Sequence, residues 1–378
     1  MNDQKRLEIR RGVTTARDAR LAARELFSAL DQPGIALAVF YCSPDYDLAA
    51  LGDELARLFR GINLIGCTTA GEITPSGYLS GALTGVSIAG DDFIAQTTMI
   101  ALDPFETARG SAAVGELLAQ IESAGTCPLP NNTFAFLLVD GLSMQEELVV
   151  SCTNQRLAGI PLFGGSAGDE TRFRHTHLFF DGRFHTNVAL LTLVQTTHPF
   201  TVFRTQHFVP SETKMVVTGA DPGRRIVHEI NGYPAGREFA RLVGLDVEEL
   251  TPLIFAAHPV VVRIGGEDFV RSIQKVNEDG SLTFFCAIDE GIVLTVAKGI
   301  DLVKNLQDAF DQVLARVGKP QLVLGCDCIL RRIEAEQREV KDQIGRILAD
   351  NNVIGFATYG EQFNAMHVNQ TFTGVAIG

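Results

Sequence analysis

Three carboxylates in this sequence stand directly behind a glycine, at the end of similar phrases. Glu72 ends Ile-Gly-Cys-Thr-Thr-Ala-Gly-Glu, Asp169 ends Phe-Gly-Gly-Ser-Ala-Gly-Asp, and Glu361 ends Ile-Gly-Phe-Ala-Thr-Tyr-Gly-Glu. If these carboxylates converged with perturbed pKa values, they could act as paired acids and bases. We favour the alternative that each accepts hydrogen bonds from the backbone amides of its own loop.

A serine in the middle phrase is a candidate nucleophile. Ser166 stands in Gly-Gly-Ser-Ala-Gly, but a nucleophile elbow leads from a strand into a helix, whereas an acidic loop and a predicted hairpin follow here. Because no glycine phrase is followed by Lys-Ser or Lys-Thr, a Walker phosphate loop is excluded. No feature argues for catalysis, so we expect a protein that is not an enzyme.

The thiols and clustered imidazoles do not form a recognised metal or disulfide pattern. Seven cysteines, an odd and scattered set, do not predict a disulfide framework. Cys326 and Cys328 are too close in sequence for a zinc knuckle. His175, His177 and His185 gather at one predicted hairpin, but their spacing matches no zinc site. Most of the thiols are expected to be small buried hydrophobes.

Charge and hydropathy narrow the choice of partners. The net charge of −13 disfavours a phosphate backbone as partner, and the pairs Arg224-Arg225 and Arg331-Arg332 are interpreted as solvated faces. The chain has no apolar run of roughly 18 residues or more, which predicts no transmembrane helix. Its first residues carry charges where a signal peptide needs an apolar region. We expect a cytoplasmic protein that binds neither nucleic acid nor membrane.

The elements around the three phrases predict how these residues are positioned. An apolar strand, a helix and a second strand precede each glycine turn, with first strands at 35–40, 134–139 and 322–324. Ser143 and Glu146 have the spacing of a capping box for the second helix. The third helix has its apolar face at 333–347. Repetition in this order predicts βαβ units whose loops gather at one rim, rather than a coincidence of glycine-rich strand exits.

Further patterns complete the predicted architecture. A first helix covers 15–30, with Thr15 and Asp18 as start signals, and another helix covers about 300–317. Hairpins with Asp-Gly turns are predicted at 177–184 and 269–286. The last strand, at 368–377, is expected inside a sheet, and a domain boundary within 197–225. The predicted fold class is α/β, with repeated βαβ units, glycine turns and added β-hairpins in two domains.

These phrases, in this order, resemble the FIST sensory family. Residues 66–72 and 164–169 resemble the signature turns of its N-terminal part, and 230–235, 271–273, 279–282 and 359–361 resemble its C-terminal part. The resemblance covers roughly 30–365. It implies a FIST N domain at 30–222 and a FIST C domain at 223–366, with the last strand running to about 377. Because no kinase, cyclase or receiver module is present, it implies a stand-alone sensor.

The last segment, 359–374, is similar to the tail of the nitric-oxide-sensing haemoproteins called NosP. This closer resemblance implies a b-type haem, nitric oxide as gas ligand, and regulation of a partner histidine kinase in two-component signalling. It leaves open whether the protein is a homodimer.

A haem sensor needs one protein ligand to the iron, an apolar cleft and an open side for the gas. Under the resemblance, His367 is the best candidate for the iron ligand, and Tyr359, Phe363 and Met366 are assigned to the cofactor site. Strand alternation places His367 on the same face as Asn369. The alternative is a hydrogen-bonded histidine at a strand entry, and His258 is the second candidate for the iron.

Two other functions stay open. The first is a FIST binding module for a small organic metabolite such as an amino acid, held among the glycine turns without haem. This alternative predicts a colourless protein. The second is an enzyme, which requires a convergent catalytic set that the sequence does not display.

Overall fold

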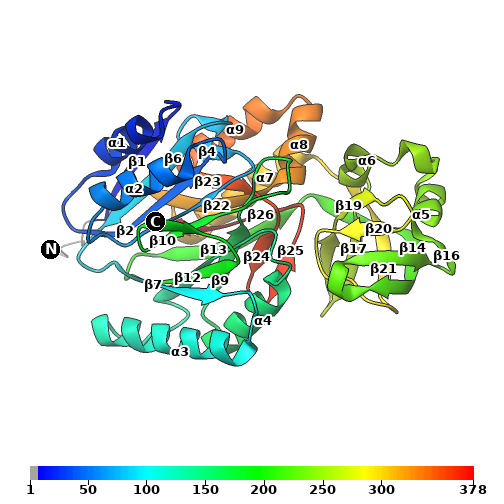
Figure 1. Ribbon diagram of the computed structural model, residues 1–378, viewed down its shortest axis with the longest axis horizontal. Coiled ribbons are helices and arrows are strands. Elements are labelled where there is room, and N and C mark those ends of the chain that lie inside the picture. The colour runs from blue at the N-terminus through cyan, green and yellow to red at the C-terminus, as the bar shows by residue number, and fades with distance from the viewer. Residues whose placement is uncertain (1–6) are drawn as a thin grey trace.

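Three six-stranded β-sheets form the body of the protein, and the same succession of elements builds each of them (Figure 1). The structure is a computed structural model that describes residues 7–378. The charged start of the chain, on which the expectation about a signal peptide depends, lies largely outside these residues. Among the described residues, no helix combines the length and apolarity that a membrane crossing requires.

The chain forms three consecutive modules with the same order of strands and helices. The first comprises β1 (Glu8–Thr14), α1 (Ala19–Leu30), β2 (Ile35–Cys42), α2 (Leu48–Leu58), β3 (Leu64–Thr68), β4 (Glu72–Thr74), β5 (Gly77–Leu79) and β6 (Leu83–Ala89). The second comprises β7 (Ile94–Ala101), α3 (Thr107–Ala124), β8 (Thr133–Val139), α4 (Glu146–Leu157), β9 (Leu162–Ser166), β10 (Leu178–Phe180), β11 (Arg183–His185) and β12 (Val188–Gln195). The third comprises β13 (Phe200–Gln206), α7 (Leu302–Val317), β22 (Leu322–Cys328), α8 (Ile329–Gln337), α9 (Lys341–Asp350), β23 (Val353–Thr358), β24 (Glu361–Phe363), β25 (Met366–Val368) and β26 (Thr371–Ile377).

The hairpin that follows each glycine turn leaves its own module and joins a neighbouring sheet. Hairpin β4–β5 pairs with β23, hairpin β10–β11 pairs with β3, and hairpin β24–β25 pairs with β9. The three sheets therefore exchange hairpins in a cycle, and each sheet is completed by a strand pair from another module.

The first glycine of each repeated phrase permits close approach to the parallel strand of its own module, β2, β8 or β22. Gly66, Gly164 and Gly355 lie opposite the second residue of the incoming hairpin. A Cβ at these positions would lie 2.6, 2.0 and 1.9 Å from a neighbouring backbone carbonyl oxygen. Since only glycine lacks that atom, the repeated glycine is explained by close backbone approach.

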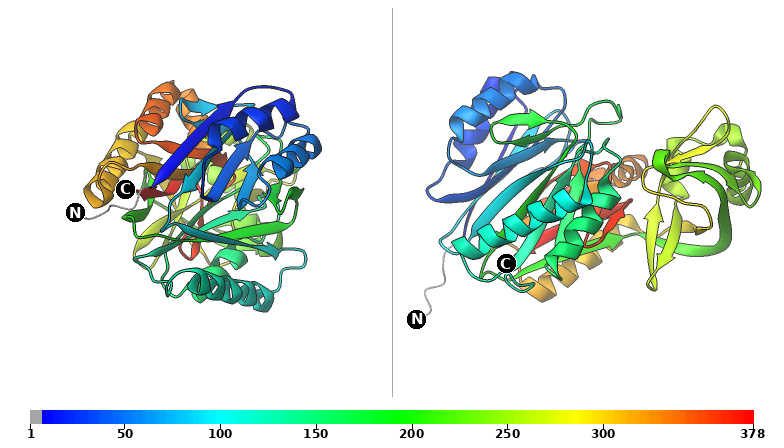
Figure 2. Two further views of the ribbon diagram at one scale, coloured as in Figure 1. Left: turned by 90° about the vertical axis from the view of Figure 1, so that its left-hand side faces the viewer. Right: turned by 60° about the horizontal axis from the view of Figure 1, so that its bottom comes forward.

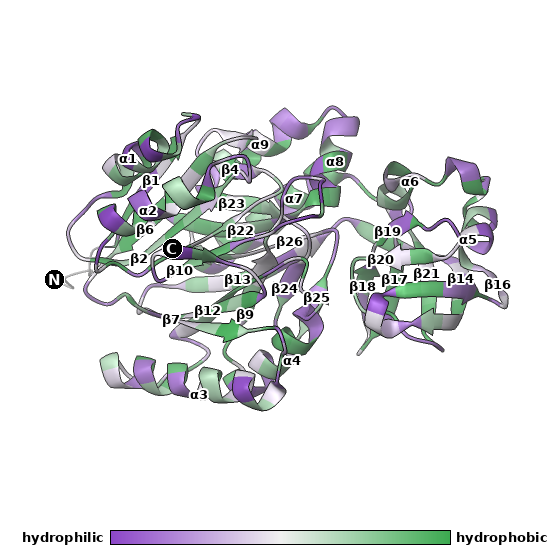
Figure 3. Cartoon of the chain, viewed as in Figure 1, coloured by the Kyte–Doolittle hydropathy of each residue, from purple (hydrophilic) through white to green (hydrophobic). Residues whose placement is uncertain are grey.

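The inner faces of the three sheets share one apolar core. Residues from β2, β8 and β22 and from their neighbouring strands meet there, and the rings of Tyr41 and Phe356 stack at 4.7 Å between centroids. The outer faces are covered by helices of their own modules, and the left view of Figure 2 shows these helices at three corners around the sheets. Figure 3 shows the matching pattern of apolar strands and polar outward helix surfaces.

A smaller lobe, Phe208–Gly299, is inserted between β13 and α7 of the third module and projects to one side (Figures 1 and 2). It has its own apolar core. The expected boundary at residue 222 falls inside this lobe. Its elements are β14 (Phe208–Asp221), η1 (Pro222–Arg224), β15 (Ile226–Ile230), β16 (Tyr233–Pro234), α5 (Ala235–Val243), η2 (Val247–Glu249), α6 (Pro252–Ala257), β17 (Val260–Ile264), β18 (Glu267–Arg271), β19 (Ile273–Val276), β20 (Leu282–Phe284) and β21 (Val293–Gly299).

The structure confirms the predicted α/β class, the repeated βαβ units and the added hairpins. The last strand, β26, pairs with both β13 and β22, so it lies inside a sheet as expected. Asp18 caps α1 by accepting a hydrogen bond from the backbone nitrogen of Leu21 at 2.8 Å.

Two local predictions are wrong. The capping box at Ser143 and Glu146 does not form, because the Ser143 hydroxyl donates to the carbonyl of Asp140 at 2.7 Å and α4 begins at Glu146 without a side-chain cap. The apolar face at 333–347 belongs to two helices, α8 and α9, because the chain leaves the helical path at Arg338 and continues at Lys341.

Candidate functional site

The three glycine turns interlock at the meeting point of the sheets. The backbone nitrogen of Ala357 donates to the carbonyl of Gly71 at 2.7 Å, and that of Ser166 donates to the carbonyl of Gly360 at 2.8 Å. The backbone nitrogen of Gly168 donates to the carbonyl of Thr68 at 3.0 Å. Loops that are far apart in sequence therefore form one buried junction.

The carboxylate behind each turn is bound by its own module. Glu72 accepts from the backbone nitrogen of Ala82 at 3.1 Å, and Glu361 accepts from that of Thr371 at the same distance. Asp169 accepts from three backbone nitrogens within its loop. Burial raises the pKa of Glu72 to about 7 and the pKa of Glu361 to about 8. These contacts agree with the expectation that each carboxylate accepts hydrogen bonds from backbone amides and holds its loop.

The three hairpins have the same register, and their central cross-strand pairs can be compared directly. In β4–β5 the pair is Ile73 and Tyr78, and in β10–β11 it is Phe179 and Phe184. In β24–β25 the equivalent pair is Gln362 and His367.

The polar pair in β24–β25 is buried. The exposed fraction is 0% for Gln362 and 2% for His367. Buried polar groups cost stability unless they are fully hydrogen-bonded. The other two modules have Ile73 with Tyr78, whose hydroxyl bonds Asp327, and Phe179 with Phe184. The fold therefore does not require glutamine and histidine at these positions.

The imidazole of His367 is only partly satisfied. Its Nδ1 lies 3.3 Å from Nε2 of Gln362, and its Nε2 has no hydrogen-bond partner. Burial lowers the pKa of His367 to about 4, against the opposing effects of the Glu147 carboxylate and of the nearby backbone of Phe285. The ring is therefore neutral at physiological pH and presents a buried, unpartnered nitrogen.

More unpartnered polar atoms surround this ring. His367 Nε2 and Asn369 Nδ2 approach the same point of the third turn, since a Cβ on Gly360 would lie 2.8 and 3.1 Å from them. His367 and Asn369 thus lie on one face, as strand alternation predicts. The other buried polar atoms without a partner in this region are Ser272 Oγ, Gln362 Oε1, and Gln370 Nε2 and Oε1.

The lobe closes over this hairpin. Arg271 Nη1 donates to the carbonyl of His367 at 3.1 Å, and the backbone nitrogen of Ser272 donates to Oδ1 of Asn369 at 3.4 Å. The polar hairpin is thus covered by residues of the lobe, and a change in the hairpin can reach the lobe directly.

The donor chemistry of His367 fits the iron of a haem. The ring is neutral and buried, and its Nε2 is unpartnered, as an axial ligand requires. The packing is closed, however, because a Cβ on Gly360 would lie only 2.3 Å from Cε1 of His367. Room for a macrocycle beside this ring therefore requires the hairpin and the lobe to move apart.

The other predicted cofactor residues occupy different surroundings. Tyr359 is 4% exposed; its hydroxyl bonds Asp169, and its ring stacks on Phe173. Phe363 and Met366 face each other across the hairpin, next to the Gln362–His367 pair. Because side chains alternate along a strand, Phe363 and Met366 lie on the opposite face from His367.

Sequence reasoning missed Gln362, although it placed Asn369 on the same face as His367. The signal was present, since Glu72 to Tyr78 and Glu361 to His367 have equal spacing. An alignment of the two phrases would have placed His367 at the position of an aromatic residue.

The expectation that two arginine pairs are solvated is wrong for three of the four residues. Arg225, Arg331 and Arg332 are buried. Arg225 pairs with Glu146 and Glu147 at 2.6 Å, and Arg331 pairs with Asp327 at 2.7 Å. Arg225 and its partners come from different modules, so the sequence around it does not reveal its pairing.

Two other histidines also have a buried ring nitrogen without a hydrogen-bond partner, namely Nδ1 of His177 and Nε2 of His198. His175 is exposed, His177 and His185 are half-buried, and His258 ends α6 as its C-cap. Within residues 7–378, no group of three or more histidine, cysteine, aspartate or glutamate side chains could hold a metal ion.

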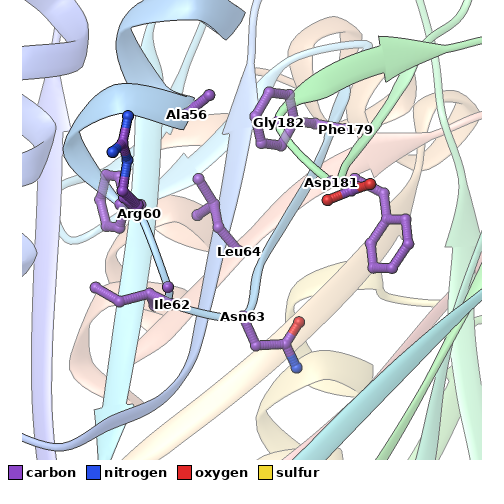
Figure 4. Close-up of a pocket in the computed structure, with 11 residues that line it drawn as sticks. Ala56, Arg60, Ile62, Asn63, Leu64, Phe179, Asp181 and Gly182 are labelled. Carbon is purple, nitrogen blue, oxygen red and sulfur yellow. The ribbon is translucent and has the colours of Figure 1, made fainter.

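A cavity of about 310 Å³ lies beside α2 and the β10–β11 hairpin (Figure 4). Arg60 and Asp181 stand on opposite sides of it, and Leu64 and Phe179 line it. None of the predicted site residues borders this cavity, which belongs to the first sheet.

Comparison with protein families gave two adjoining matches. The model of the FIST N domain matches residues 36–233, and the model of the FIST C domain matches residues 235–364. The two matches meet at β16, inside the lobe. A search of the curated proteins gave no significant match.

Proposed function

This chain belongs to the FIST family of sensory signalling domains, and we propose that it senses nitric oxide through a b-type haem held by His367. The observation that carries the proposal is the break in the internal repeat. One of three equivalent hairpins carries Gln362 and His367 where the other two carry aliphatic and aromatic side chains, and the imidazole nitrogen it buries has no partner. The tail resemblance to NosP proteins, which stays a prediction, supports the same residue.

Gln362 is the residue that would set the tautomer of His367. With Nε2 of Gln362 facing Nδ1, the imidazole proton lies on Nε2. Ligation through Nε2 needs that proton on Nδ1, where the unpartnered Oε1 of Gln362 would accept it after the carboxamide turns. When bound, ferrous haem supplies a coordination position for a diatomic gas.

The signal would leave the site through the lobe. Arg271 and Ser272 of the lobe bond the hairpin that carries His367, so a shift of the hairpin changes the contacts that orient the lobe. Coupling requires two arrangements with different affinities for a partner. The partner in this proposal is a histidine kinase, and no catalytic role is assigned to the chain itself.

The surface of the lobe suits a docking role. Of the fourteen large apolar side chains exposed among the described residues, six belong to the lobe: Val209, Val216, Tyr233, Leu253, Ile264 and Val293. The lobe thus carries a disproportionate share of the apolar surface that signalling partners use.

A second candidate function is binding of a small polar metabolite, such as an amino acid, at the same hairpin without haem. The specific observation in its favour is the set of unpartnered donors and acceptors around His367, including Asn369 Nδ2 and Ser272 Oγ. Such a mixed set matches a ligand that has both donors and acceptors.

The visible absorption spectrum after haem addition separates the two candidates. The haem proposal expects a Soret band at one haem per chain that shifts when nitric oxide is added. His367→Leu should lose this band, whereas the matched control His258→Leu should keep it. A wild-type protein that takes up no haem, or a His367→Leu variant with full uptake, would contradict the proposal.

A further inference from the structure

A cavity between the core and the lobe has walls suited to a flat ligand. Its volume is about 450 Å³, within the range of small-molecule sites. Phe173, Phe285 and Tyr359 line it. The ring of Phe173 stacks on Tyr359 at 4.5 Å between centroids and lies 5.7 Å from Phe285. Such a cluster offers aromatic faces against which another ring can stack.

The backbone around this cavity is held in an unusual conformation. Met144, Phe173 and Arg225 all line it, and their φ angles are 56°, 51° and 55°. Bulky residues rarely adopt this left-handed region. The Asp169 carboxylate fixes the loop by accepting from the backbone nitrogen of Phe173 at 2.8 Å and by bonding the Tyr359 hydroxyl. Strain that is held in place at one cavity is typical of a preorganised binding site.

Two cations at this cavity lack partners. Arg224 and Lys275 line it, and in the part of the chain that the structure describes neither forms an ion pair. Arg225, their neighbour, pairs with two carboxylates, Glu146 and Glu147, and Glu146 also lines the cavity. In a protein with a net charge of −13, two free cations beside one cavity create a local positive field that attracts an anion.

We propose that this cavity binds a flat organic anion, namely a carboxylate attached to an aromatic or conjugated ring. The ring would pack against Phe173 and Tyr359, and the carboxylate would face Arg224 and Lys275. His367 does not line this cavity, although Arg225 and Phe285 border both the cavity and that histidine, and the proposal does not rest on haem binding at His367. Because Phe285 belongs to the lobe whereas Phe173 and Tyr359 belong to the core, an occupied cavity would bear on the position of the lobe.

Ligand-observed fluorine NMR of the full chain tests the proposal with three probes. 4-Fluorobenzoate is flat and anionic, 4-fluorobenzamide is flat and neutral, and 4,4-difluorocyclohexanecarboxylate is anionic but not flat. We expect 4-fluorobenzoate to bind with a dissociation constant on the order of 1 mM and the other two about tenfold more weakly.

Charge-matched variants locate the site. Arg224→Gln with Lys275→Gln should weaken 4-fluorobenzoate about tenfold and leave 4-fluorobenzamide unchanged, because only the anion loses a partner. Arg237→Gln with Lys298→Gln makes the same charge change in the lobe, away from the cavity, and should have no effect. Phe173→Leu should weaken both flat probes.

Three results would overturn the proposal. They are absence of 4-fluorobenzoate binding to the wild-type chain, equal affinity for all three probes, and an unchanged affinity in the Arg224/Lys275 variant. His367→Leu should retain 4-fluorobenzoate binding, and its loss in a folded variant would make the cavity part of the His367 site. Failure of haem uptake leaves these expectations unchanged, so the two proposals fail separately.

Discussion

At the scale of single residues, the buried carboxyl of Glu361 accepts a hydrogen bond from a threonine hydroxyl at each of its two oxygens. Thr358 Oγ1 lies 2.6 Å from the carbonyl of Gly360 and 3.2 Å from Oε1 of Glu361. The hydroxyl proton of Thr358 is shared between these two acceptors, with the shorter contact to Gly360. Burial outweighs the threonine hydrogen bonds and raises the pKa of Glu361 to about 8, so the carboxyl is largely protonated at neutral pH.

Glu361→Gln should remove a loss of stability at high pH. The pKa of Glu361 rises from 4.5 in the unfolded chain to about 8, so its contribution is full below pH 4.5 and is lost as pH rises to 8. That loss amounts to at most about 5 kcal/mol. The glutamine can donate to Thr358 and accept from Thr371, so we expect similar urea stability at pH 5 and a more stable variant at pH 9. Exposed Glu248→Gln is the control, and equal destabilisation of Glu361→Gln at both pH values would contradict this account.

At the scale of elements, the start of α4 fastens the lobe to the core. Glu146 and Glu147 occupy the first helical turn, where the helix dipole favours carboxylates. Arg225 of the lobe pairs with both and also donates to the carbonyl of Phe285. The backbone nitrogen of Ala287 donates to Glu147. One arginine therefore links a helix start, a lobe strand and the loop that covers His367.

Arg225→Leu should loosen this link without unfolding the sheets. Breaking a buried ion pair by removing one partner costs roughly 3–5 kcal/mol, because the remaining charges stay buried. We expect faster hydrogen exchange in 285–287 and at the start of α4, with unchanged exchange in β8 and β22. Arg237→Leu, an exposed residue of the same lobe, should change neither region. Unaltered exchange at 285–287 in Arg225→Leu would show that the pair does not hold the lobe.

At the scale of the whole molecule, three modules exchange hairpins around a common core, and the symmetry is broken in two places. The lobe interrupts the third module between β13 and α7. The hairpin of the same module carries Gln362 and His367 where the others carry aliphatic and aromatic side chains. Both departures meet where Arg271 bonds His367. Comparing equivalent positions of the three modules thus identifies Gln362 and His367 as candidate functional residues.

Much of this architecture could be predicted from local patterns. The glycine phrases indicated the repeated units, and Asp181-Gly182 marked a hairpin tip with φ values of 49° and 79°. Hairpin exchange could not be predicted, because each hairpin pairs with a strand from another module. The burial of Arg225 was missed for a similar reason, since Glu146 lies 79 residues away in sequence. His367 was named from the sequence as a candidate, which stays a prediction, but its pairing with Gln362 became apparent only from the register of the three hairpins.

The central claim is that the polar pair serves a ligand rather than the fold. Replacing both residues by apolar ones of similar volume, Gln362→Met with His367→Leu, should leave the melting temperature of the ligand-free protein unchanged or higher. The same double variant should lose the stoichiometric Soret band that we expect of the wild-type protein with haem. The most direct test is therefore to measure haem uptake and thermal unfolding together for both proteins. A variant that unfolds at a much lower temperature, or one that still takes up a full equivalent of haem, would contradict the account.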